Sequence, residues 1–362
     1  MGARESQGWE VEVGGFSMVI GDVPAFTGTP VVGHPHVEEI QSRSLAWMCD
    51  MGLLPVPELR ARYAGMRVGA WPSHCYPYTS FDYGLLLACW WSWWTYVDDV
   101  APRMDCDQWL KLSLDMEHVL RCAGDNAVPT DGSDSGQPLL HSLADLCRRT
   151  AAAGSDAYYE QVAAGSIDAL YGFGLEALNE RLHRTPDIDL ELSIHCEYLR
   201  GRYKTIGLIL DVAYIEGALG FDVPHAVRRT TAWQDVLETA FSVMILQNDL
   251  VGADRDDAAS DTYNAVSLLC RLHGLSPADA KRQVTRTIAA RIAEFLHLER
   301  VFPDRVIDLH LPAVELQRVQ DVISKVKVMS QGALAWYTET SRYIPASRTA
   351  NTGDRFPSRC QA

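Results

Sequence analysis

The sequence predicts an all-α protein built as a single helical bundle. Long stretches show the spacing of apolar side chains that is typical of amphipathic helices, whereas the strict alternation of a half-buried strand is scarce. No internal repeat and no shift in composition marks a second domain. Apolar residues make up 47% of the 362 residues and charged residues 22%, which is the composition of a folded globular protein. We expect about ten to twelve helices around one core.

Helical patterns begin near residue 36 and continue almost to the end of the chain. In the first, over residues 37–54, apolar side chains recur on one face at Ile40, Leu45, Trp47, Met48 and Met51. The second, over residues 79–97, is intensely apolar and is followed by Pro102, which stops a helix. Residues 124–137 are rich in Gly, Asp and Ser, which predicts a surface loop. The other expected helices cover residues 106–123, 138–153, 157–183, 189–219, 225–251, 277–301 and 311–343.

The two ends of the chain differ from this pattern. Residues 1–35 are rich in Gly, Val and Pro without a helical period, which predicts an extended leader over the surface. Residues 345–362 are polar and contain Pro and Gly, which predicts a disordered tail. The predicted helical domain therefore covers residues 36–344.

The charge of the chain excludes several partners. There are 32 basic and 47 acidic residues, a net charge of −15. This charge argues against sequence-independent binding of nucleic acid and against binding to an anionic membrane, since both need a basic surface. The most apolar stretch, Tyr83–Val97, is shorter than the roughly 20 residues of a membrane span. No secretory signal is apparent, and the nine cysteines lack metal-type spacing. We expect a cytoplasmic protein.

The first chemically informative segment is the end of the apolar helix, where Asp98 and Asp99 stand side by side. Carboxylates at a helix C-terminus oppose the helix dipole, so the placement is locally unfavourable. Solvent exposure, a salt bridge or a bound divalent cation would each offset this cost, and the segment alone does not choose among them.

The second segment reads LQNDLVGADRDD. Asn248, Gly252 and Asp256 recur at intervals of four and therefore share one helix face. Asn248 and Asp256 supply the oxygen donors that Mg²⁺ prefers, and Arg255 beside them could hold an anion. A polar stripe of this kind is also typical of a solvated helix face.

Together, the two segments resemble the metal-binding motifs of class I terpene synthases of the bacterial type. That family pairs an aspartate-rich DDxxD motif with an NDxxSxxxE motif on a facing helix, in an all-α bundle with a central cavity. The resemblance implies that Asp98, Asn248 and Asp256 bind Mg²⁺, with Asp99 and a water at the position of Gly252 as further candidate ligands. It also implies three Mg²⁺ ions and a prenyl diphosphate substrate.

Three further segments match the family at its spacing. Arg202 lies 46 residues before the asparagine of the second motif, where the family carries a diphosphate-sensing arginine. Residues 205–207 stand at the place of a helix break that moves when substrate binds. Arg342 and Tyr343 match a pair that hydrogen-bonds the diphosphate, and Arg255 matches a diphosphate-binding basic residue. The resemblance covers roughly residues 30–345 and implies catalytic roles for Arg202, Arg342 and Tyr343.

The chain also departs from the family pattern. Pro102 stands at the last position of the aspartate-rich motif, and Asp105 could replace it only if the loop folds back. Gly252 replaces the serine of the second motif, and Asp256 replaces its glutamate, with one methylene less of reach. The neighbouring acids that could help are Asp254 and Asp257.

The resemblance also explains the tryptophan-rich helix. Residues 90, 91, 93 and 94 are all tryptophan and cover about 400° of a helix, so at least two must pack against neighbouring helices. We assign Trp90 and Trp93 to packing. An aromatic cavity excludes water, and its π faces stabilise a cation. The cavity residues implied by the resemblance are Trp94, Thr95, Ile206 and Trp336.

The implied activity is that of a lyase that ionises a linear prenyl diphosphate and cyclises the resulting carbocation, with release of diphosphate. Farnesyl diphosphate is the expected substrate and a sesquiterpene hydrocarbon or alcohol the product; geranylgeranyl diphosphate is the alternative. A chain-elongating prenyltransferase would need a second aspartate-rich motif. A non-enzymatic relic that binds prenyl diphosphate weakly is a further alternative, given Gly252 and Asp256. We expect a monomer or a homodimer.

Overall fold

The computed structural model describes residues 12–13, 16–17, 23–26, 32–124, 137–182, 184–189, 196–258 and 263–343. The predicted tail, residues 345–362, lies outside the described residues, as do most of the predicted leader and most of the predicted loop at 124–137. These three predictions therefore stay untested. Within the leader, two short strands, β1 (Glu12–Val13) and β2 (Phe16–Ser17), pair in antiparallel register.

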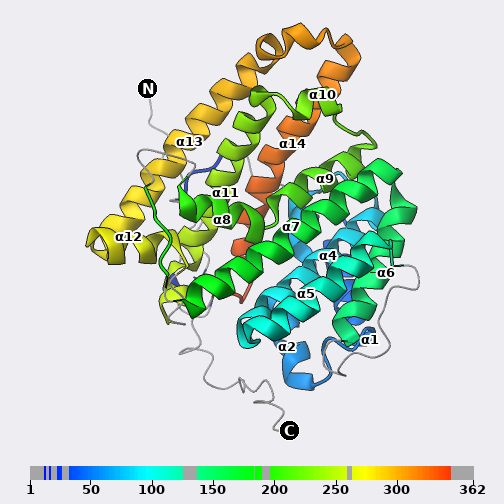
Figure 1. Cartoon of the computed structure of the whole chain (residues 1–362), viewed down its shortest axis with the longest axis vertical. Helices are drawn as coiled ribbons and strands as arrows, with labels where there is room; N and C mark the ends of the chain where they lie inside the picture. The colour runs from blue at the N-terminus through cyan, green and yellow to red at the C-terminus, as the bar shows by residue number, and fades with distance from the viewer. Residues whose placement is uncertain are drawn as a thin grey trace.

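Helices account for nearly all of the remaining described chain, as the sequence predicts, and they form two groups around a central set (Figure 1). In one group α5, α6 and α7 pack side by side, and in the other α11, α12 and α13 do so. Between them, α4 packs on α1, α3 and α6, and α14 packs on α3 and α9. The helices are α1 (Val37–Asp50), α2 (Pro57–Met66), α3 (Ala70–Cys75), α4 (Phe81–Val100), η2 (Ala101–Arg103), α5 (Cys106–Arg121), α6 (Gln137–Ala153), α7 (Asp156–Arg181), α8 (Glu197–Thr205), α9 (Leu208–Leu219), α10 (His225–Arg228), α11 (Thr231–Ala258), α12 (Ala265–His273), α13 (Pro277–Arg305), η3 (Ile307–Leu309) and α14 (Ala313–Tyr337).

Side-chain caps set where several of these helices begin. The Ser80 side chain accepts from the backbone N–H of Tyr83 at the start of α4. At the start of α5, Asp105 and Gln108 form a reciprocal capping box. Asp105 is therefore engaged in the helix cap, and the structure does not turn it back toward the paired aspartates.

The structure corrects several predicted boundaries. The helix predicted over 189–219 is two helices, α8 and α9, separated at Ile206 and Gly207, where Gly207 adopts a left-handed φ of +75°. The helix predicted over 225–251 is the short α10 followed by the long α11, which runs on to Ala258. The predicted end came too early because the segment after residue 251 is polar and lacks the apolar periodicity that marks a helix. Helix α3 was not predicted because all six of its residues are buried, which removes the periodic signal.

The tryptophans of α4 divide as predicted. Trp90 and Trp93 are fully buried, and their N–H groups donate to Thr150 Oγ1 (2.8 Å) and to the Leu139 carbonyl (3.3 Å) on α6. The ring of Trp91 lies 3.7 Å from that of Trp71, centroid to centroid. Among the described residues, no helix is long and apolar enough to cross a membrane.

Candidate active site

The paired aspartates at the end of α4 meet the segment that follows α14. The half-exposed Asp98 forms an ion pair with Arg342. Asp99 is half-buried and accepts from Arg342 (3.3 Å) and from the Tyr63 hydroxyl (2.8 Å), with the Arg62 guanidinium at 3.2 Å. The salt bridge that would offset the helix dipole is therefore present, and Arg342 binds both carboxylates.

Asn248 of α11 connects two predicted site residues, Arg202 and Tyr343, and also contacts Tyr337, which was not predicted. Its Oδ1 accepts from the Arg202 guanidinium (3.2 Å), and its Nδ2 donates to the hydroxyls of Tyr343 (2.9 Å) and Tyr337 (3.0 Å). Arg202 also donates to Thr205 Oγ1 (3.1 Å) at the break between α8 and α9. The predicted asparagine, sensing arginine and C-terminal tyrosine thus form one continuous network.

Asp256 and Gly252 lie one turn apart on α11 beside Tyr343. Asp256 is buried and accepts from Arg255 (2.7 Å) and from Asn264 Nδ2 (2.8 Å). A Cβ added at Gly252 would lie 3.0 Å from Asp256 Oδ2, which is a tight contact, and 3.5 Å from the Tyr343 ring. The missing side chain at residue 252 therefore leaves the room that this orientation of the Asp256 carboxylate uses.

Arg255 reaches the same group from its own side of α11. Its guanidinium stands 5.0 Å from the centroid of the Tyr343 ring, within range of a cation–π contact. The two neighbouring acids that the sequence left open do not join the site. Asp254 is exposed and pairs with Lys281 (2.6 Å) on the surface, and Asp257 is exposed.

The sequence reasoning missed the role of Asp249. This buried carboxylate accepts from the Tyr198 hydroxyl (2.5 Å) and from the backbone N–H of Ala265 (3.2 Å). Burial raises the pKa of Asp249 to about 6, although Arg202 and the Tyr198 hydrogen bond oppose the rise. Asp249 thereby joins α11 to α8 and to the start of α12, a role that its position beside Asn248 could have suggested.

The arginines of the site lie in a strongly acidic setting. Burial lowers the pKa of Arg202, but acidic groups that include Asp249 and Asp98 outweigh it and raise the pKa well above the ordinary value. The same balance of burial against Asp99 and Asp98 raises the pKa of Arg342. Carboxylates of the site therefore stabilise the charged form of both guanidinium groups.

The oxygen donors of this site differ from a ready-made metal cluster. Among the described residues no three His, Cys, Asp or Glu side chains converge as a ready-made metal cluster. The oxygens of Asp98, Asn248 and Asp256 are nevertheless carboxylate and amide donors, the kind that a hard divalent cation prefers. Their partners are Arg342, Arg202 and Arg255, the groups that an anion would draw away. The chemistry of the residues therefore fits a cation that arrives with an anion.

The four predicted cavity residues differ in burial. Trp94 is buried and its ring stacks on Phe173 of α7, with centroids 6.2 Å apart. Thr95 and Ile206 are half-buried. Trp336 is buried against Tyr343, with centroids 6.1 Å apart, and donates to the Arg67 carbonyl (2.8 Å).

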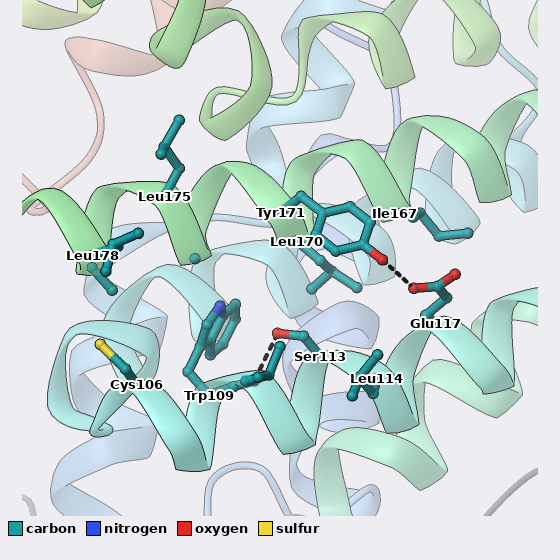
Figure 2. Close-up of a pocket in the computed structure, with 13 residues that line it drawn as sticks. Cys106, Trp109, Ser113, Leu114, Glu117, Ile167, Leu170, Tyr171, Leu175 and Leu178 are labelled. Atoms are coloured by element: carbon teal, nitrogen blue, oxygen red, sulfur yellow. Dashed lines mark hydrogen bonds between the residues drawn. The ribbon is translucent and has the colours of Figure 1, made fainter.

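A groove of about 370 Å³ lies elsewhere, between α5 and α7 (Figure 2). Its walls are mostly apolar; the polar exceptions include Ser113 and Glu117, and Glu117 accepts from the Tyr171 hydroxyl (2.7 Å). None of its lining residues is a predicted site residue.

The fold and this constellation define a metal-binding all-α enzyme, and the comparisons with known proteins agree. The profile described as "Terpene synthase family 2, C-terminal metal binding" matches residues 89–294. Pentalenene synthase of Streptomyces arenae is 27% identical over 85% of this chain and 89% of that protein. Pristinol synthase of Streptomyces pristinaespiralis is 24% identical over 89% of this chain and 85% of that protein.

Solved structures show the same fold. Linalool/nerolidol synthase from Streptomyces clavuligerus superposes with a TM-score of 0.73 at 22% identity, over 86% of this chain and 99% of that one. An α-eudesmol synthase gives a TM-score of 0.72 at 20% identity, over 87% and 97%. The chain belongs to terpene synthase family 2. It is a class I terpene synthase, an enzyme that cyclises prenyl diphosphates.

Proposed function

We propose that this enzyme is a Mg²⁺-dependent cyclase of farnesyl diphosphate that makes a sesquiterpene hydrocarbon or alcohol. The observation that carries the proposal is the network in which Asn248 joins Arg202 to Tyr343 while Asp98, from the facing helix, holds Arg342. Two relatives, 4-epi-cubebol synthase of Streptosporangium roseum and 7-epi-alpha-eudesmol synthase of Streptomyces viridochromogenes, are named as cyclising farnesyl diphosphate.

The metal sites in this proposal use the predicted ligands. Asp98 binds Mg²⁺ from α4, and Asn248 and Asp256 bind it from α11, with a water in place of a side chain at Gly252. Three bound Mg²⁺ ions would neutralise the charge that develops on the leaving diphosphate. Asp99 is already engaged by Tyr63 and Arg342, so we assign it to positioning that arginine.

The arginines and Tyr343 form the diphosphate site. In the structure Arg342 neutralises Asp98, and Arg255 neutralises Asp256. A diphosphate that binds Arg202, Arg255, Arg342 and Tyr343 competes for the same donors and thereby frees the two carboxylates for cations. Preorganised donors of this kind stabilise the charge that forms as the carbon–oxygen bond breaks.

Beside the diphosphate site, the four proposed cavity residues shape the space for the hydrocarbon chain and protect it from water. Trp94 and Trp336 supply π faces. Thr95 of α4 and Ile206, at the break between α8 and α9, line the remaining wall. Their task is to exclude water and to stabilise positive charge without reacting with it.

Incubation with geranyl, farnesyl and geranylgeranyl diphosphates plus Mg²⁺ tests the proposal, with the products identified by gas chromatography and mass spectrometry. We expect a cyclic C15 product from farnesyl diphosphate and none after chelation of the metal. A cyclic product from geranylgeranyl diphosphate alone would move the substrate to the C20 class. No terpene from any of the three would overturn the catalytic proposal.

A further inference from the structure

A buried amide side chain contacts the polar face of α11 at two points. Asn264, the residue before α12, is fully buried. Its Nδ2 donates to Asp256 Oδ2 (2.8 Å) and to the backbone carbonyl of Asp249 (2.9 Å). Its Oδ1 accepts from the backbone N–H of Val266 (2.9 Å) and thereby caps α12. Asn264 therefore joins α12 to α11 and directly contacts a proposed metal ligand.

The three partners of Asn264 define the chemistry that residue 264 needs. Two of the partners are acceptors and one is a donor. A side-chain amide supplies two N–H donors and a carbonyl acceptor from one small group, whereas a carboxylate of the same size only accepts. All three hydrogen bonds can form at once in only one orientation of the amide. The capped end of α12 thus fixes the direction from which Asp256 is held.

The two oxygens of the Asp256 carboxylate have different partners. Oδ1 is paired with Arg255, whose Nε lies at 2.7 Å and whose Nη2 lies at 2.5 Å. Oδ2 accepts from Asn264, and it is also the oxygen that a Cβ at Gly252 would meet at 3.0 Å. One oxygen is therefore bound by a charged group and the other by a neutral amide in a confined place.

This difference determines which oxygen can change its partner. An anion attracts the Arg255 guanidinium and can draw it away from Oδ1, but it has no such attraction for the neutral Asn264. Without Asn264, the carboxylate could turn both of its oxygens to the guanidinium, which is the bidentate pairing that arginine favours. Asn264 opposes that rotation and keeps Oδ2 in place.

We propose that Asn264 is a positioning residue for the metal site on α11, holding Asp256 Oδ2 so that Oδ1 is left for the cation. The inference rests on the proposed cyclase function and deepens it. Hydrogen-bond partners of metal ligands orient those ligands, and their loss typically lowers metal affinity about 10- to 100-fold. Asn264 acts through Asp256 and is not itself a ligand, because its Oδ1 is engaged in the cap of α12.

Binding of Mn²⁺ in the presence of inorganic pyrophosphate tests this role without turnover. Mn²⁺ accepts the same oxygen ligands as Mg²⁺, and electron paramagnetic resonance measures the free ion. We expect Asn264→Ala to raise the dissociation constant of Mn²⁺ about 10- to 100-fold. Asn264→Ser keeps an oxygen that can cap α12 but is too short to reach Asp256. It should weaken binding in the same way, and it serves if the alanine variant does not fold.

Ser276→Ala is the matched control for the loss of a helix cap. Ser276 caps α13 by accepting from the backbone N–H of Asp279 (3.1 Å), and no hydrogen bond of the described chain joins it to Asp256. We expect this variant to lower the melting temperature and to leave Mn²⁺ binding unchanged. An equal loss of Mn²⁺ affinity in Ser276→Ala would show that any lost cap has this effect, and it would overturn the inference.

A double-mutant cycle shows whether Asn264 acts through Asp256. Adding Asn264→Ala to Asp256→Ala should weaken Mn²⁺ binding no further, because the group that Asn264 positions is already absent. A further loss as large as in the wild-type background, or unchanged binding in the Asn264→Ala and Asn264→Ser variants, would overturn the inference.

Kinetics give a second measurement of the positioning role. In turnover of farnesyl diphosphate, a high Mg²⁺ concentration should restore most of the kcat of Asn264→Ala, which a purely structural defect would not permit. A loss of kcat that Mg²⁺ does not reverse would contradict the inference, as would a wild type that binds no Mn²⁺. A wild type that binds Mn²⁺ but forms no terpene would overturn only the proposed function.

Discussion

Asn248 makes hydrogen bonds to side chains from α8, from α14 and from the segment after α14. Two of these partners, Arg202 and Tyr343, are candidates for binding or sensing the diphosphate, and the amide oxygen is a proposed metal ligand. One small side chain therefore connects the cation site to the anion site. Neighbouring Asp249 supports this arrangement by joining α11 to α8 and α12, so that the position of Asn248 depends on both helices.

Substitution of Asn248 is the most direct test at this scale. We expect Asn248→Ala to lower kcat/KM by about 100-fold or more, because a proposed ligand and three hydrogen bonds are lost together. Asp254→Asn, on the exposed side of the same helix, is the control and should leave the kinetics unchanged. Equal activity of wild type and Asn248→Ala would show that the network plays no part in turnover.

Gly252 and Asp256 form a coupled pair, because a Cβ at residue 252 crowds the Asp256 carboxylate. We expect Gly252→Ser alone to raise the Mg²⁺ concentration needed for half-maximal activity. Adding Asp256→Glu should lower it again, since the longer side chain can move the carboxylate away. Titrating activity against Mg²⁺ for the wild type, the two single variants and the double variant measures this. Additive effects of the two substitutions would contradict the coupling.

At the scale of elements, helix α9 is bounded by two glycines with left-handed φ angles, Gly207 at +75° and Gly220 at +56°. Neither has a neighbour in the described part of the chain that an added Cβ would meet within 3.4 Å, so both glycines are required by the backbone conformation alone. The break at Gly207 is the end of α9 that lies beside Arg202 and Thr205.

The two left-handed glycines at the ends of α9 provide a matched pair of variants. Gly207→Ala and Gly220→Ala should each lower the free energy of unfolding by about 1 kcal/mol, because alanine is strained at these φ angles. Only Gly207→Ala should also lower kcat, since it stiffens or shifts the break next to Arg202, the proposed diphosphate-sensing arginine. Denaturant unfolding and steady-state kinetics of both variants separate the two effects. An equal loss of kcat in both would mean that the break has no special role.

Helix α9 also carries a titrating group. Burial raises the pKa of Glu216 from 4.5 to about 7, and Arg228 opposes the rise. A carboxyl with a raised folded-state pKa contributes stability below pH 4.5 and loses that contribution as the pH rises toward about 7. The melting temperature of the wild type should therefore fall relative to that of Glu216→Gln between these pH values. A difference that is constant with pH would contradict this.

At the scale of the whole molecule, the site is assembled from parts that are distant in the chain. The end of α4, the end of α8, the polar face of α11 and the segment after α14 each contribute a charged residue. In the structure these charges neutralise one another as arginine–carboxylate pairs. An anion and cations that arrive together can replace those pairs, so binding should link the four segments.

Ligand binding should therefore stabilise the entire bundle. We expect inorganic pyrophosphate together with Mg²⁺ to raise the melting temperature, by the equivalent of about 2.7 kcal/mol at 100 times the dissociation constant. Either component alone should have a much smaller effect, because each leaves one set of charges unbalanced. Arg342→Ala should reduce the joint effect. An equal shift with Mg²⁺ alone would indicate a metal site that does not need the diphosphate.

Local pattern was sufficient to predict the helical class, the apolar helix ending in Asp98 and the polar stripe from Asn248 to Asp256. These features depend on side chains within a few turns of one another, so the periodicity of the sequence records them directly. The resemblance to terpene synthases added Arg202, Arg342 and Tyr343, which the structure brings into contact with the two motifs. Their chemical roles stay predictions.

The tertiary structure alone decided which partners each group meets. Asp249 joins three helices, and Asp211 of α9 has one carboxyl oxygen without a hydrogen-bond partner among the described residues. Neither could be read from neighbours in the sequence. The physical reason is that burial and hydrogen bonding depend on residues tens or hundreds of positions away. The sequence determined which side chains carry charge and which face of a helix they share; the packing determined which charges are paired and which oxygen is left free.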